Sequence, residues 1–223
     1  MYLIELSDFC LNPIGTGNGL KNSYFALSSG DICSLQTDST DDAHIFLKAL
    51  ATLVSPVSGT YCFTGEMINF SDYRELLPFK RKIGYIGQDS AMISNRTVRE
   101  NLLLMRCYFE NSLLLPLDEN VTKFLKIFDL EDKLDLRPGE LRPVDLRTAI
   151  AIREITKSFD VLLLDRPEHY FGFKSFYIFN EILEDILKAG HAVVFFSRDR
   201  DFIETFSNRK VLIAGGTLTQ ITR

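Results

Sequence analysis

The sequence predicts an α/β fold in which a mainly parallel β-sheet is flanked by helices, with an antiparallel β edge and an inserted helical lobe. Short apolar segments alternate with helical patterns along the chain, as in proteins with parallel sheets. The run VLLL at residues 161–164 is continuously apolar, which suits a strand buried on both faces. Between residues 90 and 142 the pattern becomes helical, and this block predicts the inserted lobe.

The predicted strands are short apolar or alternating segments bounded by turn residues. Gly30 and Asp31, for example, form the predicted turn between the second and third strands. Strands are predicted, in chain order, at residues 2–6, 22–26, 32–36, 60–63, 82–86, 161–164 and 192–196.

The predicted helices are recognised by their apolar period and by their first residues. Residues 41–53 carry apolar side chains at helical spacing. Thr97, followed by Glu100 at the third position, predicts a capped helix start at the beginning of the lobe. Further helices are predicted at residues 117–130 and 174–188. We expect residues 1–223 to form a single domain, into which the lobe at residues 90–142 is inserted.

The composition excludes some classes of function. The net charge is −5, so no basic excess exists to neutralise nucleic-acid phosphates, and we expect no nucleic-acid partner. Apolar runs such as residues 102–104 are far too short to cross a bilayer. We therefore expect no direct membrane insertion and a cytoplasmic location. Any membrane association is expected to come through a partner.

Five segments occur in an order typical of one family. They are LVSPVSG at residues 53–59, KIGYIGQD at 82–89, TVRENL at 97–102, PGEL at 138–141 and LLLDRP at 162–167. In these segments the chain resembles the ATP-binding subunits of ABC transporters, over nearly its whole length. The resemblance implies a P-loop-NTPase-like fold.

In that family a loop of the form G-x-x-x-x-G-K-[ST] wraps the phosphates of ATP with backbone N–H groups, and its Lys and hydroxyl bind phosphate and Mg²⁺. The resemblance places this loop at residues 37–44. The defining positions hold Thr37 and Asp42 for the glycines, Ala43 for the lysine and His44 for the hydroxyl. The positions that would contact nucleotide are Thr37, Ser39, Thr40, Asp42, Ala43, His44 and Ile45.

Two carboxylates add to these losses. Asp41 and Asp42 bring negative charge to the place of the phosphates, where two unit charges about 4 Å apart repel by about 1 kcal/mol in water and about 4 kcal/mol at an intermediate dielectric. We interpret both residues as capping and dipole-matching residues of the following helix. Without its glycines, we expect the loop to be collapsed or bent by side-chain hydrogen bonds from Asp38, Ser39 and Thr40 to nearby N–H groups.

The family's signature motif, L-S-G-G-[QE], maps to LRPVD at residues 141–145. Pro143 has no N–H to donate, and Val144 is bulky where the backbone must approach closely. Arg142 is expected in an exposed ion pair or on a solvated face rather than on a phosphate.

The catalytic positions are also altered. Arg166 stands where the family has its catalytic Glu, and a guanidinium cannot act as a base. Arg198 replaces the switch His. Gln88 and Asp165 are retained, and in an active member both would contact Mg²⁺ or its waters. Here Gln88 can simply be a hinge and Asp165 a turn cap, so neither a catalytic residue nor a cofactor is expected.

The resemblance implies a dimer in which each ATP site combines one subunit's phosphate loop with the other's signature, so this chain alters both sites. We therefore predict a pseudo-ATPase that is a structural or regulatory partner of a transmembrane permease, with a second ATPase-like subunit in a homo- or heterodimer. One alternative is a functional subunit that uses ATP and Mg²⁺, its ATP site rescued by unusual residues such as Arg142, Arg166 and Arg198. Another is a soluble adaptor unrelated to transport. Exposed apolar side chains around residues 79–105 favour the permease partner, and a uniformly polar groove favours the adaptor.

Overall fold

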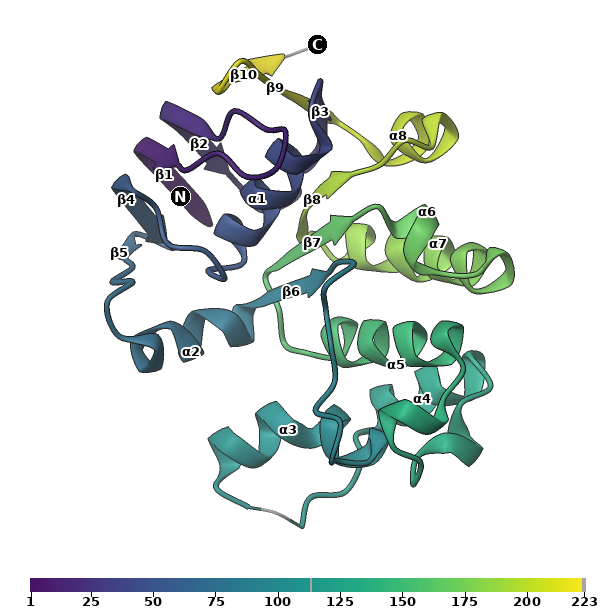
Figure 1. Ribbon diagram of the computed structural model, residues 1–223. Helices are drawn as coiled ribbons and strands as arrows, with labels where there is room; N and C mark the ends of the chain where they lie inside the picture. Colours follow the sequence, from purple (N-terminus) through teal and green to yellow (C-terminus); the bar gives the residue numbers. More distant parts are fainter. Residues whose placement is uncertain (113, 222–223) are drawn as a thin grey trace.

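The computed structural model describes residues 1–112 and 114–221, and it contains two sheets with helices packed on and between them (Figure 1). The larger sheet has the strand order β10-β9-β3-β8-β7-β6, and its pairs are parallel except for β9 with β10. This confirms the predicted mainly parallel sheet with an antiparallel edge. Its strands are β3 (Ile32–Thr37), β6 (Ile83–Ile86), β7 (Val161–Asp165), β8 (Ala192–Phe196), β9 (Arg209–Ala214) and β10 (Thr217–Ile221).

The smaller sheet is antiparallel and has the order β2-β1-β4-β5. Its inner face packs on helix α1, where the rings of Phe25 and Phe46 meet edge to face with centroids 5.3 Å apart. Helix α1 therefore lies between the two sheets. The strands of the smaller sheet are β1 (Ile4–Leu11), β2 (Leu20–Leu27), β4 (Ser58–Phe63) and β5 (Glu66–Met67).

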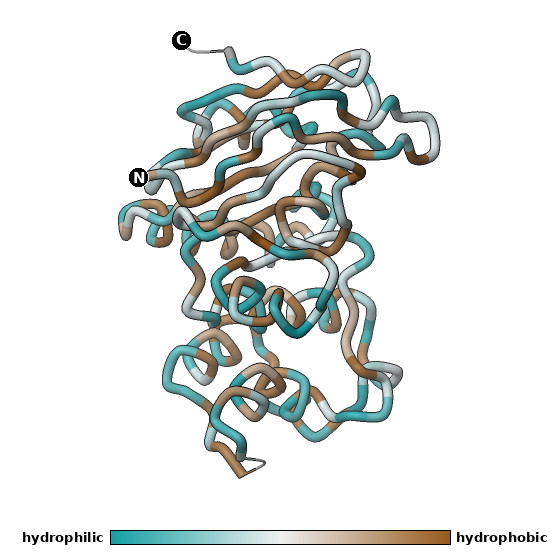
Figure 2. The backbone as a smooth tube through the Cα atoms, turned by 90° about the vertical axis from the view of Figure 1, so that its left-hand side faces the viewer, coloured by the Kyte–Doolittle hydropathy of each residue, from teal (hydrophilic) through white to brown (hydrophobic). Residues whose placement is uncertain are grey.

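A second core lies on the other face of the parallel sheet, where helices α3, α4, α5 and α7 surround the strands. Figure 2 shows the strands gathered in the upper part of the molecule and a lower part formed by helices. No helix among the described residues combines the length and apolar character needed to cross a membrane. The helices are α1 (Thr40–Leu50), α2 (Tyr73–Lys82), α3 (Val98–Glu110), α4 (Glu119–Ile127), α5 (Pro143–Ile155), α6 (Pro167–Tyr170), α7 (Phe173–Lys188) and α8 (Arg200–Phe206).

Helix α3 begins as the sequence predicts. The hydroxyl of Thr97 accepts the Glu100 N–H at 3.2 Å, and the Glu100 carboxylate accepts the Thr97 N–H at 2.7 Å. The side chain of Asn101, which is 1% exposed, then fixes the approach to the helix. Its amide oxygen accepts the Ile93 N–H at 2.7 Å, and its NH₂ group donates to the carbonyl of Thr97 at 2.9 Å. These bonds hold the segment that leads from β6 into the helices.

Several elements were not predicted. Helix α2 contains Pro78, a residue that normally interrupts helices, and half of its residues are charged. Helix α5 begins at Pro143, the residue just after the predicted end of the lobe. The helix predicted at residues 41–53 ends at Leu50. Among the other helices and strands, β5, α6, α8, β9 and β10 were also not predicted.

Replacing Asn101 with Ala tests how the approach to α3 is fixed. The substitution leaves the Ile93 N–H without its acceptor, so we expect the free energy of unfolding to fall by about 2 kcal/mol. Urea denaturation measures the change. Arg96→Ala is the control, because it removes only an exposed ion pair with Glu100 and should have a much smaller effect. Equal losses in the two variants would contradict this assignment.

Candidate functional site

The candidate site lies where the carboxyl ends of the central strands meet the start of α1. Parallel strands β3, β8 and β7 are neighbours, and the crevice beyond their carboxyl ends is the usual ligand position in sheets of this kind. Asp165 is the last residue of β7, as predicted, and its side chain is buried. Helix α1 follows β3 and begins at Thr40, so residues 37–44 lie at the carboxyl end of that strand (Figure 1).

The side chain of His44 joins α1 to β7. Its Nδ1 contacts the Oδ2 of Asp165, and its Nε2 lies 3.9 Å from the Oδ2 of Asp89. One turn further along α1, the ammonium of Lys48 pairs with the same Asp89. Two side chains from α1, an imidazole and an ammonium group, thus face two carboxylates, one at the end of β7 and one after β6.

These contacts shift the titration of the groups. The hydrogen bond to Asp165 raises the pKa of His44, and the carboxylate charge adds to this effect against partial burial. Partial burial opposes ionisation of Asp89, but Lys48 outweighs it and leaves the pKa of Asp89 below its usual range. The imidazolium form of His44 is therefore the one that the site stabilises.

Asp41 and Asp42 contact the loop between β1 and β2. The Thr16 N–H and hydroxyl donate to Asp41 Oδ2 at 2.8 and 3.0 Å, and the N–H bond lowers the pKa of Asp41. The N–H groups of Asn18 and Gly19 both donate to Asp42 Oδ1 at 2.8 Å. The carboxylates lie in the first turn of α1, where they suit its dipole. The prediction that they cap α1 is wrong, because their oxygens accept N–H groups of a different segment.

The loop at residues 37–44 is bent by a side-chain hydrogen bond, as expected, but a different residue makes it. The Thr37 hydroxyl donates to the Ser39 carbonyl at 2.8 Å and accepts the Ser39 N–H at 3.1 Å. Asp38, Ser39 and Thr40 were the residues predicted to accept nearby N–H groups with their side chains. Thr40 instead accepts a hydrogen bond from the guanidinium of Arg198 at 2.7 Å.

The three arginines considered as phosphate partners have different surroundings. Arg198 contacts the loop through Thr40, whereas Arg166 has a buried Nε without a hydrogen-bond partner among the described residues. Arg142 is 78% exposed and forms a bidentate ion pair with Asp145 at 2.8 and 3.0 Å. This is the exposed ion pair that the sequence indicated.

The remaining candidates are placed as follows. Pro143 is the first residue of α5, and Val144 packs next to the backbone of Gly172. Gln88 is exposed, and its neighbour Asp89 joins the cluster instead. Ala43 and Ile45 are residues of α1 whose side chains are buried in the core between the two sheets. Asp89, Lys48 and the β1–β2 loop were missed, although Lys48 lies four residues after His44 and so shares its helix face.

The residues present do not fit ATP with Mg²⁺. His44 occupies the contact with Asp165 that a metal-bound hydroxyl and ion need, and Asp42 is fully buried against the β1–β2 loop. The second carboxylate oxygen of Asp42 is buried without a hydrogen-bond partner among the described residues, where a phosphate oxygen would be repelled. The group that contacts Asp165 and the carboxylate that contacts the β1–β2 loop therefore both come from α1 of the chain itself.

The chain is similar in sequence to ATP-binding proteins of ABC transporters. It is 28% identical over 222 residues to the macrolide export ATP-binding/permease protein MacB of Campylobacter jejuni, in a match that covers 99% of this chain and 34% of that relative. It is 28% identical over 149 residues to the lipoprotein-releasing system ATP-binding protein LolD of Buchnera aphidicola, covering 66% of this chain and 65% of that relative. The chain spans about a third of the length of the MacB relative. No family model matches it.

Solved structures show the same fold. The dimeric structure of MJ0796, a bacterial ABC transporter cassette, superimposes with a TM-score of 0.81 at 20% identity and covers 98% of both chains. A post-hydrolysis structure of the same cassette, bound to ADP and Pi, also gives a TM-score of 0.81, at 19% identity. The fold is therefore that of an ABC transporter ATP-binding cassette, as the five sequence segments predicted. In sequence and in fold the chain is thus similar to ATP-binding subunits of ABC transporters.

The pair between His44 and Asp165 predicts a pH dependence of stability. Because the pair raises the pKa of His44, its stabilisation is complete below the unfolded-state value of about 6.5 and is lost as the pH rises through the folded-state value. We expect His44→Asn to destabilise the protein more at low than at high pH. Urea denaturation of both proteins, from about pH 5.5 to about pH 9.5, measures the difference. A difference that grows with pH would contradict the pair.

Proposed function

We propose that this chain is a cassette-like subunit or domain of a membrane transporter that does not hydrolyse ATP and acts as a structural or regulatory partner of a permease. The observation that carries the proposal is the contact of His44 with Asp165. The imidazole takes the place where the family's hydroxyl and Mg²⁺ would meet the strand end. The altered positions Arg166 and Arg198 support it, because neither guanidinium can accept a proton from water at neutral pH.

The alternative of a functional ATP-binding subunit has support from one contact. Arg198 reaches the start of α1, where a cation can attract an anion. Arg142 is held by its own Asp145, so it offers less to a phosphate. The proposal and the alternative differ in whether the chain binds MgATP, and this can be measured directly.

We expect the wild-type chain to bind MgATP with a dissociation constant above about 1 mM, which corresponds to less than about 4 kcal/mol, and to show no turnover. The physical reason is the loss of the neutralising lysine at Ala43 together with the added carboxylates. Isothermal calorimetry and a phosphate-release assay test this expectation. Micromolar affinity that is abolished by substitutions in residues 41–44 would favour the alternative.

Two variants distinguish the loss of the lysine charge at Ala43 from the altered shape of the loop at residues 37–44. Ala43→Lys alone should not restore binding, because Asp42 and the bent loop remain. Thr37→Gly, Asp42→Gly, Ala43→Lys and His44→Ser together are expected to recover binding without turnover, since Arg166 and Pro143 are unchanged. Tight binding by the single variant would mean that the loop is preformed and that charge alone was lost.

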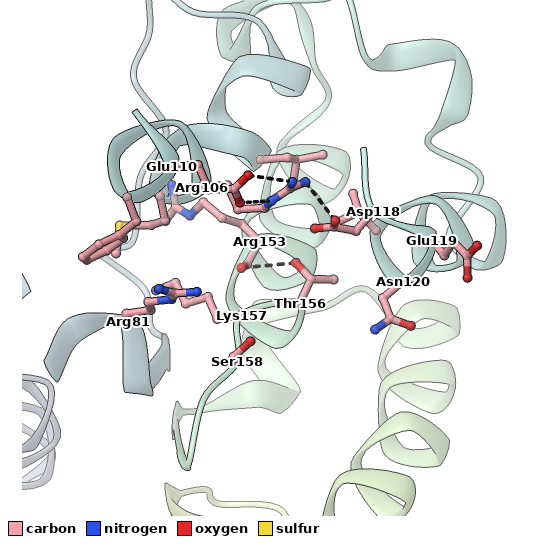
Figure 3. Close-up of a pocket in the computed structure, with 14 residues that line it drawn as sticks. Arg81, Arg106, Glu110, Asp118, Glu119, Asn120, Arg153, Thr156, Lys157 and Ser158 are labelled. Carbon is pink, nitrogen blue, oxygen red and sulfur yellow. Dashed lines mark hydrogen bonds and ion pairs between the residues drawn. The ribbon is translucent and has the colours of Figure 1, made fainter. Parts of the chain in front are cut away.

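A groove offers a place for the proposed permease to dock. A cavity of 470 Å³ lies between the end of α2, helix α3 and helix α5 (Figure 3). Leu102, Met105 and Phe109 give it an apolar side, and the guanidinium of Arg81 stacks 5.1 Å from the Phe109 ring. Its rim is charged, with Arg106 bound to Glu110 and Asp118, as Figure 3 shows. A mixed groove of this kind suits an amphipathic segment of a partner better than a uniformly polar surface does.

The groove is joined to the candidate site through one arginine. Arg153 lines the groove, and its guanidinium donates to the carbonyl of Ala91 at 2.9 Å. Ala91 lies two residues after Asp89, which pairs with Lys48. A partner bound in the groove is therefore in contact with a residue that holds the segment leading from the site.

The proposal also covers the assembly of this chain with a second subunit and a permease. The MJ0796 cassette is dimeric, and we propose that this chain likewise pairs with a second ATPase-like subunit, as a homo- or heterodimer. Residues 90–142 are proposed to be the helical subdomain that meets the permease. The complex would lie on the cytoplasmic side of the membrane, held there by the permease.

Substituting Phe109 tests the docking groove. We expect Phe109→Glu to reduce co-purification with a permease encoded next to this chain by about tenfold or more, because it places a charge on the apolar side of the groove. Tyr177→Glu is the matched control, since Tyr177 is an exposed aromatic residue on α7, outside the groove. Quantitative immunoblotting of the detergent-solubilised complex gives the ratio. Equal recovery of the permease with both variants would contradict the proposal that the permease docks in the groove.

A further inference from the structure

We propose that the loop between β1 and β2, residues 14–19, is a built-in plug that binds the two carboxylates at the start of α1 and locks the smaller sheet onto α1 without nucleotide. This inference deepens the proposed function by assigning a regulation to the same site. It concerns the conformation of the chain itself rather than its affinity for a ligand. The plug would keep the subunit in one state, whatever the nucleotide concentration.

The plug binds each carboxylate with backbone donors. Asp42 is fully buried, and one of its oxygens receives two N–H groups, from Asn18 and Gly19, each at 2.8 Å. Asp41 receives the N–H and hydroxyl of Thr16. Paired backbone N–H groups converging on one oxygen form the kind of nest that otherwise holds a phosphate or carboxylate ligand. In this chain the N–H donors and the anion both come from the protein.

The plug can approach so closely because of its glycines. A Cβ at Gly17 would lie 2.4 Å from Asp42 Oδ1, and a Cβ at Gly19, where φ is +68°, would lie 2.2 Å from the Leu11 carbonyl oxygen. Neither distance is compatible with a side chain, so only glycine allows these contacts. The repeated G-x-G-x-G spacing at residues 15–19 thus has a structural purpose in the docked conformation.

The plug is also anchored at both of its ends. Ile14 packs against the core between the sheets, and its carbonyl accepts the Gly17 N–H at 2.8 Å. Just beyond the plug, the Lys21 N–H donates to the carbonyl of Gly216, in the turn between β9 and β10, at 2.9 Å. The loop therefore connects the smaller sheet, α1 and the edge of the parallel sheet. Undocking it would release three elements together.

Residue-resolved amide hydrogen exchange of the whole chain tests the plug. We expect the amides of Thr16, Asn18 and Gly19 to be protected in the wild type, and protection at Asn18 and Gly19 to fall by about tenfold or more in Asp42→Ala. Asp38→Ala is the control, because Asp38 is an exposed carboxylate in the same bent loop. Wild-type amides that exchange at unprotected rates, or equal effects of the two substitutions, would overturn the inference.

A second variant covers the case in which Asp42→Ala does not fold. Gly17→Ala keeps both carboxylates and blocks only the close approach, so it should lower protection at the same amides by a similar factor. Unchanged protection in Gly17→Ala would also overturn the plug.

The same samples with added MgATP separate this inference from the proposed function. Exchange that is unchanged by MgATP is expected. Exchange that changes in a saturable way, with wild-type protection intact before addition, would reject the nucleotide-free function while leaving the plug in the free protein.

Discussion

The contact between His44 and Asp165 is the constraint on which the rest of the site depends. Asp165 is 1% exposed at the end of a central strand, and an ionised carboxylate in such a place needs a partner. His44 supplies it from α1, and its Nε2 side faces Asp89. The imidazole thereby fixes α1 relative to β7 and draws in the segment after β6. A side chain of the protein thus links α1 to the end of β7, as a bound metal ion can link elements in other proteins.

The same principle operates a second time on the anionic side of the site. Asp42 is buried, and its charge is met by backbone N–H groups rather than by a cationic side chain. Such bonds to an ionised acceptor are stronger than neutral ones, so they can hold a loop with few apolar contacts of its own. One oxygen of each carboxylate at the head of α1 is thus met by donors of the β1–β2 loop, while the second oxygen of Asp42 is buried without a hydrogen-bond partner among the described residues.

The sequence predicted the fold more completely than the site because the two depend on different information. Apolar runs such as residues 161–164 identify central strands without knowledge of their neighbours, and Thr97 with Glu100 marks a helix start locally. The partner of His44 lies 121 residues away, and the plug lies 24 residues before Asp42, so neither pairing has a local signal. The order of the five family segments located the loop at residues 37–44, but it could not predict which residues would contact that loop.

The segment after β6 is held by side chains at both of its ends. Asp89 is held to α1 by Lys48, and Arg153 on α5 holds the carbonyl of Ala91. Arg153 is itself oriented by Glu154, a buried residue whose pKa is lowered by Lys157 and Arg153 in spite of its burial. Movement of α5 relative to α1 would have to break an ion pair at Asp89 or a hydrogen bond at Ala91, at the two ends of a short segment. These contacts connect the groove, through α5 and the segment after β6, to α1 between the two sheets.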